Sequence, residues 1–211
     1  MTNLINFCIL NRSLPFEWKQ ARVAPVFKQG ADTDKADYRP VSILTSLSKV
    51  YEKVIYDQTW NAFHNILFKN LSGLMKTHSC CGTALLKITE DWRKSIDNKE
   101  AVAAVAVDWS KAFDAINHNL LLAKLKAYGF STQALELMST YLLSRQPCVR
   151  LDGVCSNFKT VKSGVPQGSL LGLFLFKIFI IDLNICVPIV SLQLYDDDTT
   201  AYLSDVSPNI L

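Results

Sequence analysis

The chain of 211 residues is predicted to fold as an α+β protein, with helices packed on a small antiparallel sheet. Three observations support this class. Long segments carry apolar residues at helical spacing, one short run is valine-rich and continuously apolar, and turn dipeptides separate further short strands. Hydrophobic residues make up 49% and charged residues 19% of the chain, which is typical of a folded protein and excludes a disordered one.

The first forty residues are expected to form short extended pieces joined by turns. Pro15, Pro25 and Pro40 punctuate this part, and residues 30–34 read as a polar loop. Proline fixes its own backbone and disfavours a helix at the preceding residue. The pattern therefore favours extended chain over helix here.

Two helices are predicted next. Residues 46–66 carry apolar side chains at helical spacing, with Ser46 or Ser48 as a possible N-cap. Residues 83–96 form a second amphipathic segment, followed by a turn at 97–98.

A buried strand and two more helices follow. Residues 101–107 (AVAAVAV) are continuously apolar and rich in valine, which is typical of a strand buried on both faces. Residues 119–128 and 132–143 have helical spacing, and Gly129 is expected to end the first of these helices.

Two hairpins are predicted on either side of a helix that begins near Gly168. Asp152-Gly153 is a favoured turn dipeptide for the first hairpin, and a run of aspartates forms the tip of the second. The predicted strands are residues 147–151 with 158–162, and residues 190–195 with 199–203.

The charge and the cysteines narrow the class of protein only weakly. Twenty-two basic and 19 acidic residues give a net charge of +3, which is compatible with a nucleic-acid partner without arguing for one. The six cysteines lack zinc-type spacing, and the N-terminus lacks the features of a secretory signal. Reduced thiols in an intracellular protein, in the nucleus or the cytoplasm, are expected.

One apolar run raises the alternative of a membrane-associated protein. Residues 170–181 (LLGLFLFKIFII) are apolar except for Lys177, and apolar residues resume at 185–192 after Asp182. A membrane span needs about 20 apolar residues in a row. A buried core helix explains the run better, so no membrane partner is expected.

Carboxylates gather at the ends of two predicted strands. Asp108 closes the apolar strand, and Asp196, Asp197 and Asp198 form the tip of the second hairpin. Adjacent acids repel one another unless a cation neutralises them, and Mg²⁺ prefers a few carboxylates together with waters and substrate phosphates. If the two strands are neighbours, Asp108 and the hairpin acids face a common pocket; an acidic surface turn is the alternative.

Several motifs, in order, resemble those of reverse transcriptases from non-LTR retrotransposons of the LINE and jockey kind. Residues 108–114 (DWSKAFD) resemble the first palm motif of this family, residues 164–172 (GVPQGSLLG) the second, and residues 194–199 (LYDDDT) the Tyr-X-Asp-Asp hairpin. Residues 18–28 and 38–42 resemble the fingers segment, and the likeness spans most of residues 14–205.

The resemblance implies the fingers and palm of a right-hand polymerase, without the thumb. Fingers are expected at about 1–100 and 120–163, and palm at about 101–119 and 164–211. It also implies an RNA-directed DNA polymerase that takes an RNA template, a DNA primer and deoxynucleoside triphosphates. The oligomeric state stays open.

The same resemblance assigns roles to individual residues. Asp108 and Asp197 are expected to hold two Mg²⁺ ions, or Mn²⁺, with Asp198 supporting the second carboxylate. Five further residues are expected to contact the nucleotide: Lys28 and Arg39 the triphosphate, Phe113 the deoxyribose, and Gln167 and Gly168 the nucleotide and template.

Some positions depart from the family pattern. The family has a small residue between the tyrosine and the paired acids, whereas this chain has Asp196. Leu173 stands where proline is usual, and Trp109 replaces a commoner aliphatic residue. A truncated, catalytically inactive remnant with weak nucleic-acid binding is therefore the alternative function.

Overall fold

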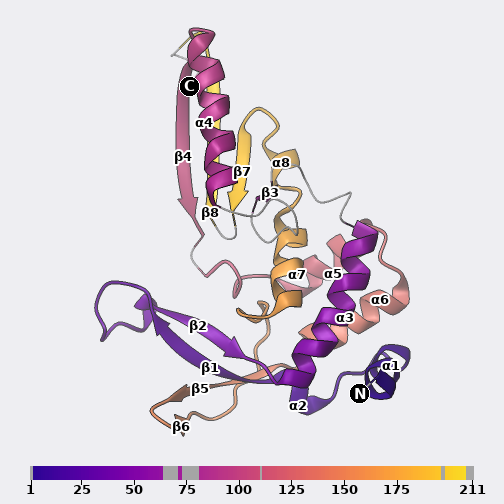
Figure 1. Ribbon diagram of the computed structural model, residues 1–211. Coiled ribbons are helices and arrows are strands. Elements are labelled where there is room, and N and C mark those ends of the chain that lie inside the picture. The colour runs from indigo at the N-terminus through magenta and orange to yellow at the C-terminus, as the bar shows by residue number, and fades with distance from the viewer. Residues whose placement is uncertain (1, 64–70, 73–80, 110, 196–197, 208–211) are drawn as a thin grey trace. The chain divides into compact units, whose positions relative to one another are not determined.

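The computed structural model describes residues 2–63, 71–72, 81–109, 111–195 and 198–207 (Figure 1). The chain divides into two compact units. Unit 1 comprises Met1–Ala62 and Phe113–Phe179, and unit 2 comprises Phe63–Ala112 and Ile180–Leu211. Helices and strands occur in both units, so the predicted α+β class is confirmed. The unit boundaries differ from the predicted limits of fingers and palm, which stay a prediction.

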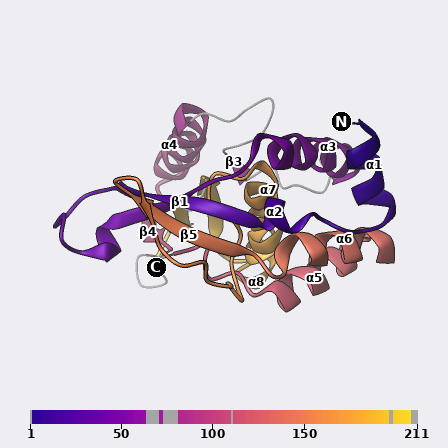
Figure 2. The same cartoon turned by 90° about the horizontal axis from the view of Figure 1, so that it is seen from below.

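Unit 1 contains a four-stranded sheet in the order β2-β1-β5-β6. The strands are β1 (Gln20–Phe27), β2 (Tyr38–Ile43), β5 (Gln146–Leu151) and β6 (Val154–Cys155). β1 pairs antiparallel with β2, and it pairs parallel with β5, beside which it lies in Figure 2. The parallel pairing of β1 with β5 joins segments that are far apart in the sequence, and the sequence analysis does not predict it.

The helices of unit 1 include three within the first forty residues that the sequence did not predict. The helices of this unit are α1 (Thr2–Leu10), α2 (Phe16–Lys19), η1 (Lys35–Asp37), α3 (Ser46–Phe63), α5 (His118–Ala127), α6 (Thr132–Leu142) and α7 (Leu170–Ile180). The extended N-terminus expected from the prolines is wrong for residues 2–10. These residues lie ahead of the first proline and bury Ile5 and Cys8, which are spaced as one face of a helix.

Local signals place several helix ends. The hydroxyl of Thr45, rather than Ser46 or Ser48, accepts from the backbone N–H of Ser48 at the start of α3 (3.3 Å). Gly129 (φ 91°) ends α5 as predicted, since its N–H donates to the carbonyl of Lys126.

The first hairpin turns at the predicted dipeptide but its second strand begins sooner. Asp152 (φ 48°) and Gly153 (φ 85°) form the turn, and β6 pairs with β5 directly afterwards. Residues 156–161 then run beside β5 through backbone hydrogen bonds, with no strand at the predicted residues 158–162. A two-residue turn with both φ angles positive matches the strand twist, so pairing starts at once.

Helix α7 is the core helix of unit 1. Leu171, Phe174 and Leu175 are at most 2% exposed, and the ring of Phe174 lies edge-on to Tyr56 of α3 at 5.6 Å. This confirms the prediction of a buried helix for the apolar run. Within the described residues, no helix has the length and hydropathy needed to span a bilayer.

Unit 2 contains the second sheet, in the order β3-β7-β8-β4. Its elements are β3 (Leu71–Ser72), α4 (Cys81–Asp97), β4 (Ala101–Asp108), α8 (Leu183–Cys186), β7 (Ser191–Tyr195) and β8 (Asp198–Asp205). β4, β8 and β7 are antiparallel neighbours, while β3 is parallel to β7. The predicted second hairpin, β7–β8, is confirmed, and helix α4 lies along the three long strands (Figure 1).

The strand β4 is present, but the prediction that it is buried on both faces is wrong. None of its residues is buried, and the side chain of Val105 is 61% exposed. β4 is an edge strand of the described sheet, with β8 as its one neighbour there. An unbroken apolar run does not distinguish a central strand from an edge strand.

Candidate active site

Two of the predicted metal-site carboxylates lie opposite each other in unit 2. The register of β4 and β8 pairs Asp108 with Asp198, and the register of β7 and β8 pairs Tyr195 with the same Asp198. Residues directly opposite each other in an antiparallel pair project from the same face of the sheet. Both aspartates are exposed. The condition set by the sequence, that the two acidic strands are neighbours, is met.

Two like charges facing each other across a ladder destabilise it unless a cation lies between them. Asp108 and Asp198 offer oxygen ligands on an accessible face, which fits Mg²⁺ because this ion binds few carboxylates and keeps several waters. Asp196 and Asp197 lie outside the described residues. Among the residues that are described, no three His, Cys, Asp or Glu side chains gather into a metal-binding group.

Trp109 anchors the end of β4 beside this pair. Its indole Nε1–H donates to the hydroxyl of Thr199 at 2.9 Å, and Thr199 is buried. The bond connects the residue after Asp108 with the residue after Asp198. Trp109, which departs from the family pattern, therefore holds the two acidic strand ends together.

The remaining predicted site residues belong to unit 1. Lys28 follows the last residue of β1, and Arg39 is the second residue of β2, paired with Val26. Both side chains are exposed, at the same end of the β1–β2 pair. The structure thus brings these two cations to one strand end.

Gln167 and Gly168 form a loop that is tied to β2. The backbone carbonyl of Gln167 accepts from the N–H of Ser42 at 2.8 Å. Gly168 has φ 88°, and a Cβ added there would lie 3.2 Å from the carbonyl oxygen of Ser42. The glycine therefore lets the loop lie close to the backbone of β2, while the expected contacts of Gln167 and Gly168 with the nucleotide and template stay a prediction.

Phe113 lies in the core of unit 1. Its ring is 7% exposed and 4.4 Å, centroid to centroid, from the ring of Phe176 in α7. Its predicted role beneath the deoxyribose stays a prediction.

Gly164 belongs to the second palm motif, and the structure shows that it makes a close backbone contact that the sequence analysis did not predict. It is buried with φ 87°, and a Cβ would lie 2.8 Å from the Cα of Asp114. Its N–H donates to the carbonyl of Ile116, and the Nε2–H of buried His118 donates to its carbonyl at 2.7 Å. His118 therefore fixes this loop by a buried hydrogen bond.

A buried polar network, also missed from the sequence, holds the other end of the same loop. The Tyr141 hydroxyl donates to Glu52 at 2.9 Å, and Ser169 donates to the other oxygen of that carboxylate at 2.8 Å. Each of the three is 1% exposed. Burial raises the pKa of Tyr141, and Glu52 adds to the rise. Glu52 lies on the buried face of α3 with Tyr51 and Ile55. An acidic residue among the apolar residues of a helix face is the sequence feature that could have predicted a buried polar network here.

Removing the Tyr141 hydroxyl is expected to destabilise unit 1. Tyr141→Phe deletes a hydrogen bond to a buried carboxylate and should lower the free energy of unfolding by about 1–3 kcal/mol. Urea denaturation measures this change. Tyr38→Phe is the matched control, because its hydroxyl donates to the Asp32 carbonyl at the surface, and it should cost under about 0.5 kcal/mol. Equal losses in both variants would show that the hydrogen bond to buried Glu52 contributes no more to the free energy of unfolding than a hydrogen bond at the surface does.

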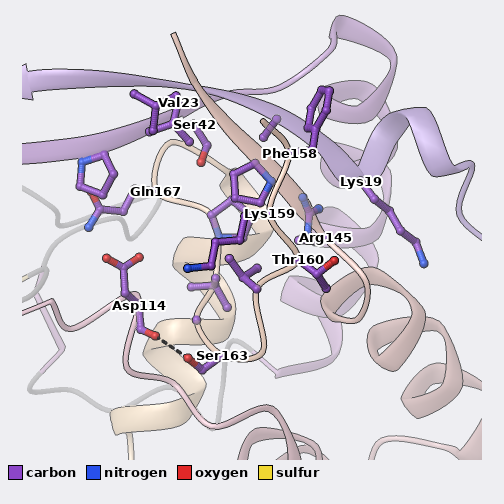
Figure 3. Close-up of a pocket in the computed structure, with 18 of the residues that line it drawn as sticks. Lys19, Val23, Ser42, Asp114, Arg145, Phe158, Lys159, Thr160, Ser163 and Gln167 are labelled. Carbon is purple, nitrogen blue, oxygen red and sulfur yellow. Dashed lines mark hydrogen bonds between the residues drawn. The ribbon is translucent and has the colours of Figure 1, made fainter. Parts of the chain in front are cut away.

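Unit 1 also contains a cleft of about 1030 Å³ (Figure 3). Its walls include Gln167 and Asp114, residues of the two palm motifs. The hydroxyl of Ser163 donates to the backbone carbonyl of Asp114 at 3.0 Å and joins two segments of the wall. One predicted nucleotide-binding residue, Gln167, thus borders an open cavity.

Comparisons with known proteins agree with these motifs. Residues 26–208 match the family model described as "Reverse transcriptase (RNA-dependent DNA polymerase)". The chain is 32% identical over 172 residues to the probable RNA-directed DNA polymerase from transposon BS of Drosophila melanogaster, covering 80% of this chain and 19% of the relative. It is 31% identical over 198 residues to the RNA-directed DNA polymerase from mobile element jockey of the same organism, covering 92% and 21%.

The fold is also similar to that of a solved telomerase. The structure of apo telomerase from Candida tropicalis truncated from the C-terminal domain superimposes with a TM-score of 0.60 at 13% identity, over 93% of this chain and 45% of that one. The chain spans about a fifth of the length of the curated relatives. The family match covers most of the chain, so this protein belongs to the reverse transcriptase (RNA-dependent DNA polymerase) family, with relatives among transposon-encoded polymerases.

Proposed function

We propose that the chain carries the nucleotidyl-transfer centre of an RNA-directed DNA polymerase. The observation that carries the proposal is the register that sets Asp108 opposite Asp198, with Tyr195 beside Asp198. In the reaction, the 3′-hydroxyl oxygen of a DNA primer forms a bond to the α-phosphorus of a deoxynucleoside triphosphate, and the bond to the pyrophosphate breaks. The RNA template selects which nucleotide is added. We expect the reaction to take place inside the cell.

Asp108, Asp197 and Asp198 are the residues that would hold two divalent metal ions, Mg²⁺ or Mn²⁺. When bound, such ions supply Lewis acidity to the attacking hydroxyl and to the leaving phosphate. The exposed face shared by Asp108 and Asp198 supports this assignment, because a metal there must also reach waters and phosphate oxygens.

The positioning of the nucleotide is assigned to unit 1. Lys28 and Arg39 would bind the triphosphate, since arginine offers paired donors and lysine a mobile charge. Gln167 and Gly168 would lie along the base pair, and Phe113 would exclude a 2′-hydroxyl. Fingers at about 1–100 and 120–163, and palm at about 101–119 and 164–211, are part of the same proposal.

Metal binding is expected to raise the thermal stability of the folded chain. At a free Mg²⁺ concentration ten times the Kd, the folded state gains about 1.4 kcal/mol, or about 3–6 °C in Tm for a chain of this size. Asp108→Asn should abolish the shift. Asp205→Asn, at the opposite end of the β4–β8 ladder, should keep it, because Asp205 pairs with Ala101 far from the acidic end. Melting with Mg²⁺ and with a chelator gives the comparison; equal shifts in all three proteins would place the metal elsewhere.

A further inference from the structure

The acidic ends of β4 and β8 are the place where the pairing of these strands is weakest. Asp108 and Asp198 form the last pair of the described ladder, and β4 has β8 as its one neighbour in the described sheet. Like charges directly opposite each other destabilise an antiparallel pair, and strand ends open more readily than strand centres. Without an opposing interaction, the two carboxylates should therefore move apart whenever no cation lies between them.

A side-chain hydrogen bond opposes this separation. Trp109 lies one residue beyond β4, and its indole Nε1–H donates to the hydroxyl of Thr199 at 2.9 Å. Thr199 is opposite Val107 in the register, so the indole reaches back diagonally across the ladder. The bond therefore ties β4 to β8 beside the pair formed by Asp108 and Asp198.

The acceptor of this bond is held in place by the sheet. Thr199 is 4% exposed and belongs to the middle of three strands, opposite Val107 of β4 and Leu194 of β7. A β-branched side chain also has few accessible rotamers. The Thr199 hydroxyl is therefore a fixed point, and the bond from Trp109 fixes the end of β4 relative to it.

The bond is made on the face of the sheet opposite to the carboxylates. Successive residues of a strand project to opposite faces, and Thr199 follows Asp198 in β8. Their exposure agrees with this arrangement, since Thr199 is buried and Asp198 is exposed. The indole thus holds the strand ends from behind and leaves the acidic face open to a cation and its waters.

Holding the carboxylates together before a cation arrives increases the affinity for that cation. If the binding-competent arrangement is only partly populated, the apparent Kd rises in inverse proportion to its population. Removing one hydrogen bond shifts such an equilibrium by about two- to tenfold. The bond between Trp109 and Thr199 therefore has a measurable consequence for metal binding.

We infer that Trp109 and Thr199 form a positioning clamp, which keeps Asp108 and Asp198 at a metal-binding spacing against their mutual repulsion and so sets the affinity for a divalent cation. The inference rests on the proposed function, because the metal site is proposed there. Trp109 replaces the aliphatic residue that is commoner in the family, and an aliphatic side chain has no N–H to donate. The clamp is thus a feature of this chain rather than of the family pattern.

Mn²⁺ binding to the full 211-residue chain, measured by electron paramagnetic resonance of the free ion, tests the inference. Trp109→Phe and Thr199→Val should each raise the Kd about two- to tenfold. The double variant should bind no more weakly than either single variant, because both changes remove the same bond. Thr199→Ser keeps the hydroxyl and should bind within about twofold of the wild type.

Trp92→Phe is the matched control. Trp92 belongs to α4 of the same unit, and its Nε1–H is buried with no hydrogen-bond partner among the described residues. This variant makes the same chemical change as Trp109→Phe without breaking a hydrogen bond. Its Kd for Mn²⁺ should therefore equal that of the wild type.

Hydrogen–deuterium exchange in chelator measures the clamp without any metal. Trp109→Phe should speed exchange about two- to tenfold in residues 105–108 of β4 and leave residues 101–104 unchanged. Adding Asp198→Asn removes the repulsion and should reduce this acceleration. A loss of packing around Trp109 alone would not depend on the charge of Asp198.

The inference is overturned if Trp109→Phe binds Mn²⁺ as tightly as the wild type, or if Trp92→Phe weakens binding as much. It is also overturned if the effects of Trp109→Phe and Thr199→Val add in full, or if exchange in residues 105–108 does not change. A wild type that binds no Mn²⁺ would contradict the proposed metal site itself. That result differs from a wild type and a Trp109→Phe variant that bind equally well, which would contradict the clamp alone.

Discussion

Gly164→Ala is expected to destabilise unit 1 severely, because the added methyl group meets both a backbone and a packing penalty. The residue has φ 87°, a region that costs an L-residue with a Cβ about 1–2 kcal/mol. The new Cβ would also lie 2.8–2.9 Å from backbone atoms of Phe113 and Asp114, which cannot rotate away. Overpacking adds about 1–3 kcal/mol. Urea denaturation should therefore show a loss of about 2–5 kcal/mol in the free energy of unfolding.

Gly153→Ala separates the two causes. Gly153 has nearly the same φ, 85°, but nothing lies within 4 Å of its added Cβ. This control should lose only the backbone cost of about 1–2 kcal/mol. If both variants lose the same amount, the contact with the Phe113–Asp114 backbone carries no energy, and Gly164 matters only as a turn residue.

Local patterns predicted most of the elements. The helices α3, α4, α5, α6 and α7 and the hairpin β7–β8 follow from apolar spacing and turn residues, which act within a few positions. The parallel pairing of β1 with β5 joins segments more than a hundred residues apart, and no local signal reports it. The exposure of β4 was missed for the same reason, because burial depends on neighbours that the strand does not encode.

The candidate site was predictable where a motif carried it. The acidic ends of β4 and β8 were expected from the sequence, and the register brings Asp108 and Asp198 together. The supporting contacts were not. The hydrogen bond of Tyr141 to Glu52 joins helices 89 positions apart, and its sole trace in the sequence is an acid on an apolar helix face. Arg145 is buried, and its two terminal nitrogens have no hydrogen-bond partner among the described residues. No local sequence pattern predicts this, because it depends on the residues packed around the side chain.

Asp108→Asn is expected to have the largest effect on activity. Asparagine keeps the size of the side chain and one oxygen but removes the negative charge that faces Asp198. Metal ions that bridge enzyme and phosphate contribute several kcal/mol of transition-state stabilisation. Losing about 4 kcal/mol of this lowers the rate about a thousandfold. Asp205→Asn makes the same chemical change at the other end of the ladder and should stay within about twofold of the wild type.

Single-nucleotide incorporation onto a DNA primer annealed to an RNA template, with Mg²⁺, is the most direct test of the proposed catalytic centre. It is measured in the chain itself and in the chain extended at its C-terminus with the following segment of the jockey relative. The predicted result is template-directed incorporation by the wild type and by Asp205→Asn, and a rate about a thousandfold lower for Asp108→Asn. Incorporation by Asp108→Asn at the wild-type rate would contradict the assignment. So would the absence of incorporation by the folded wild type, both as the chain itself and as the extended chain.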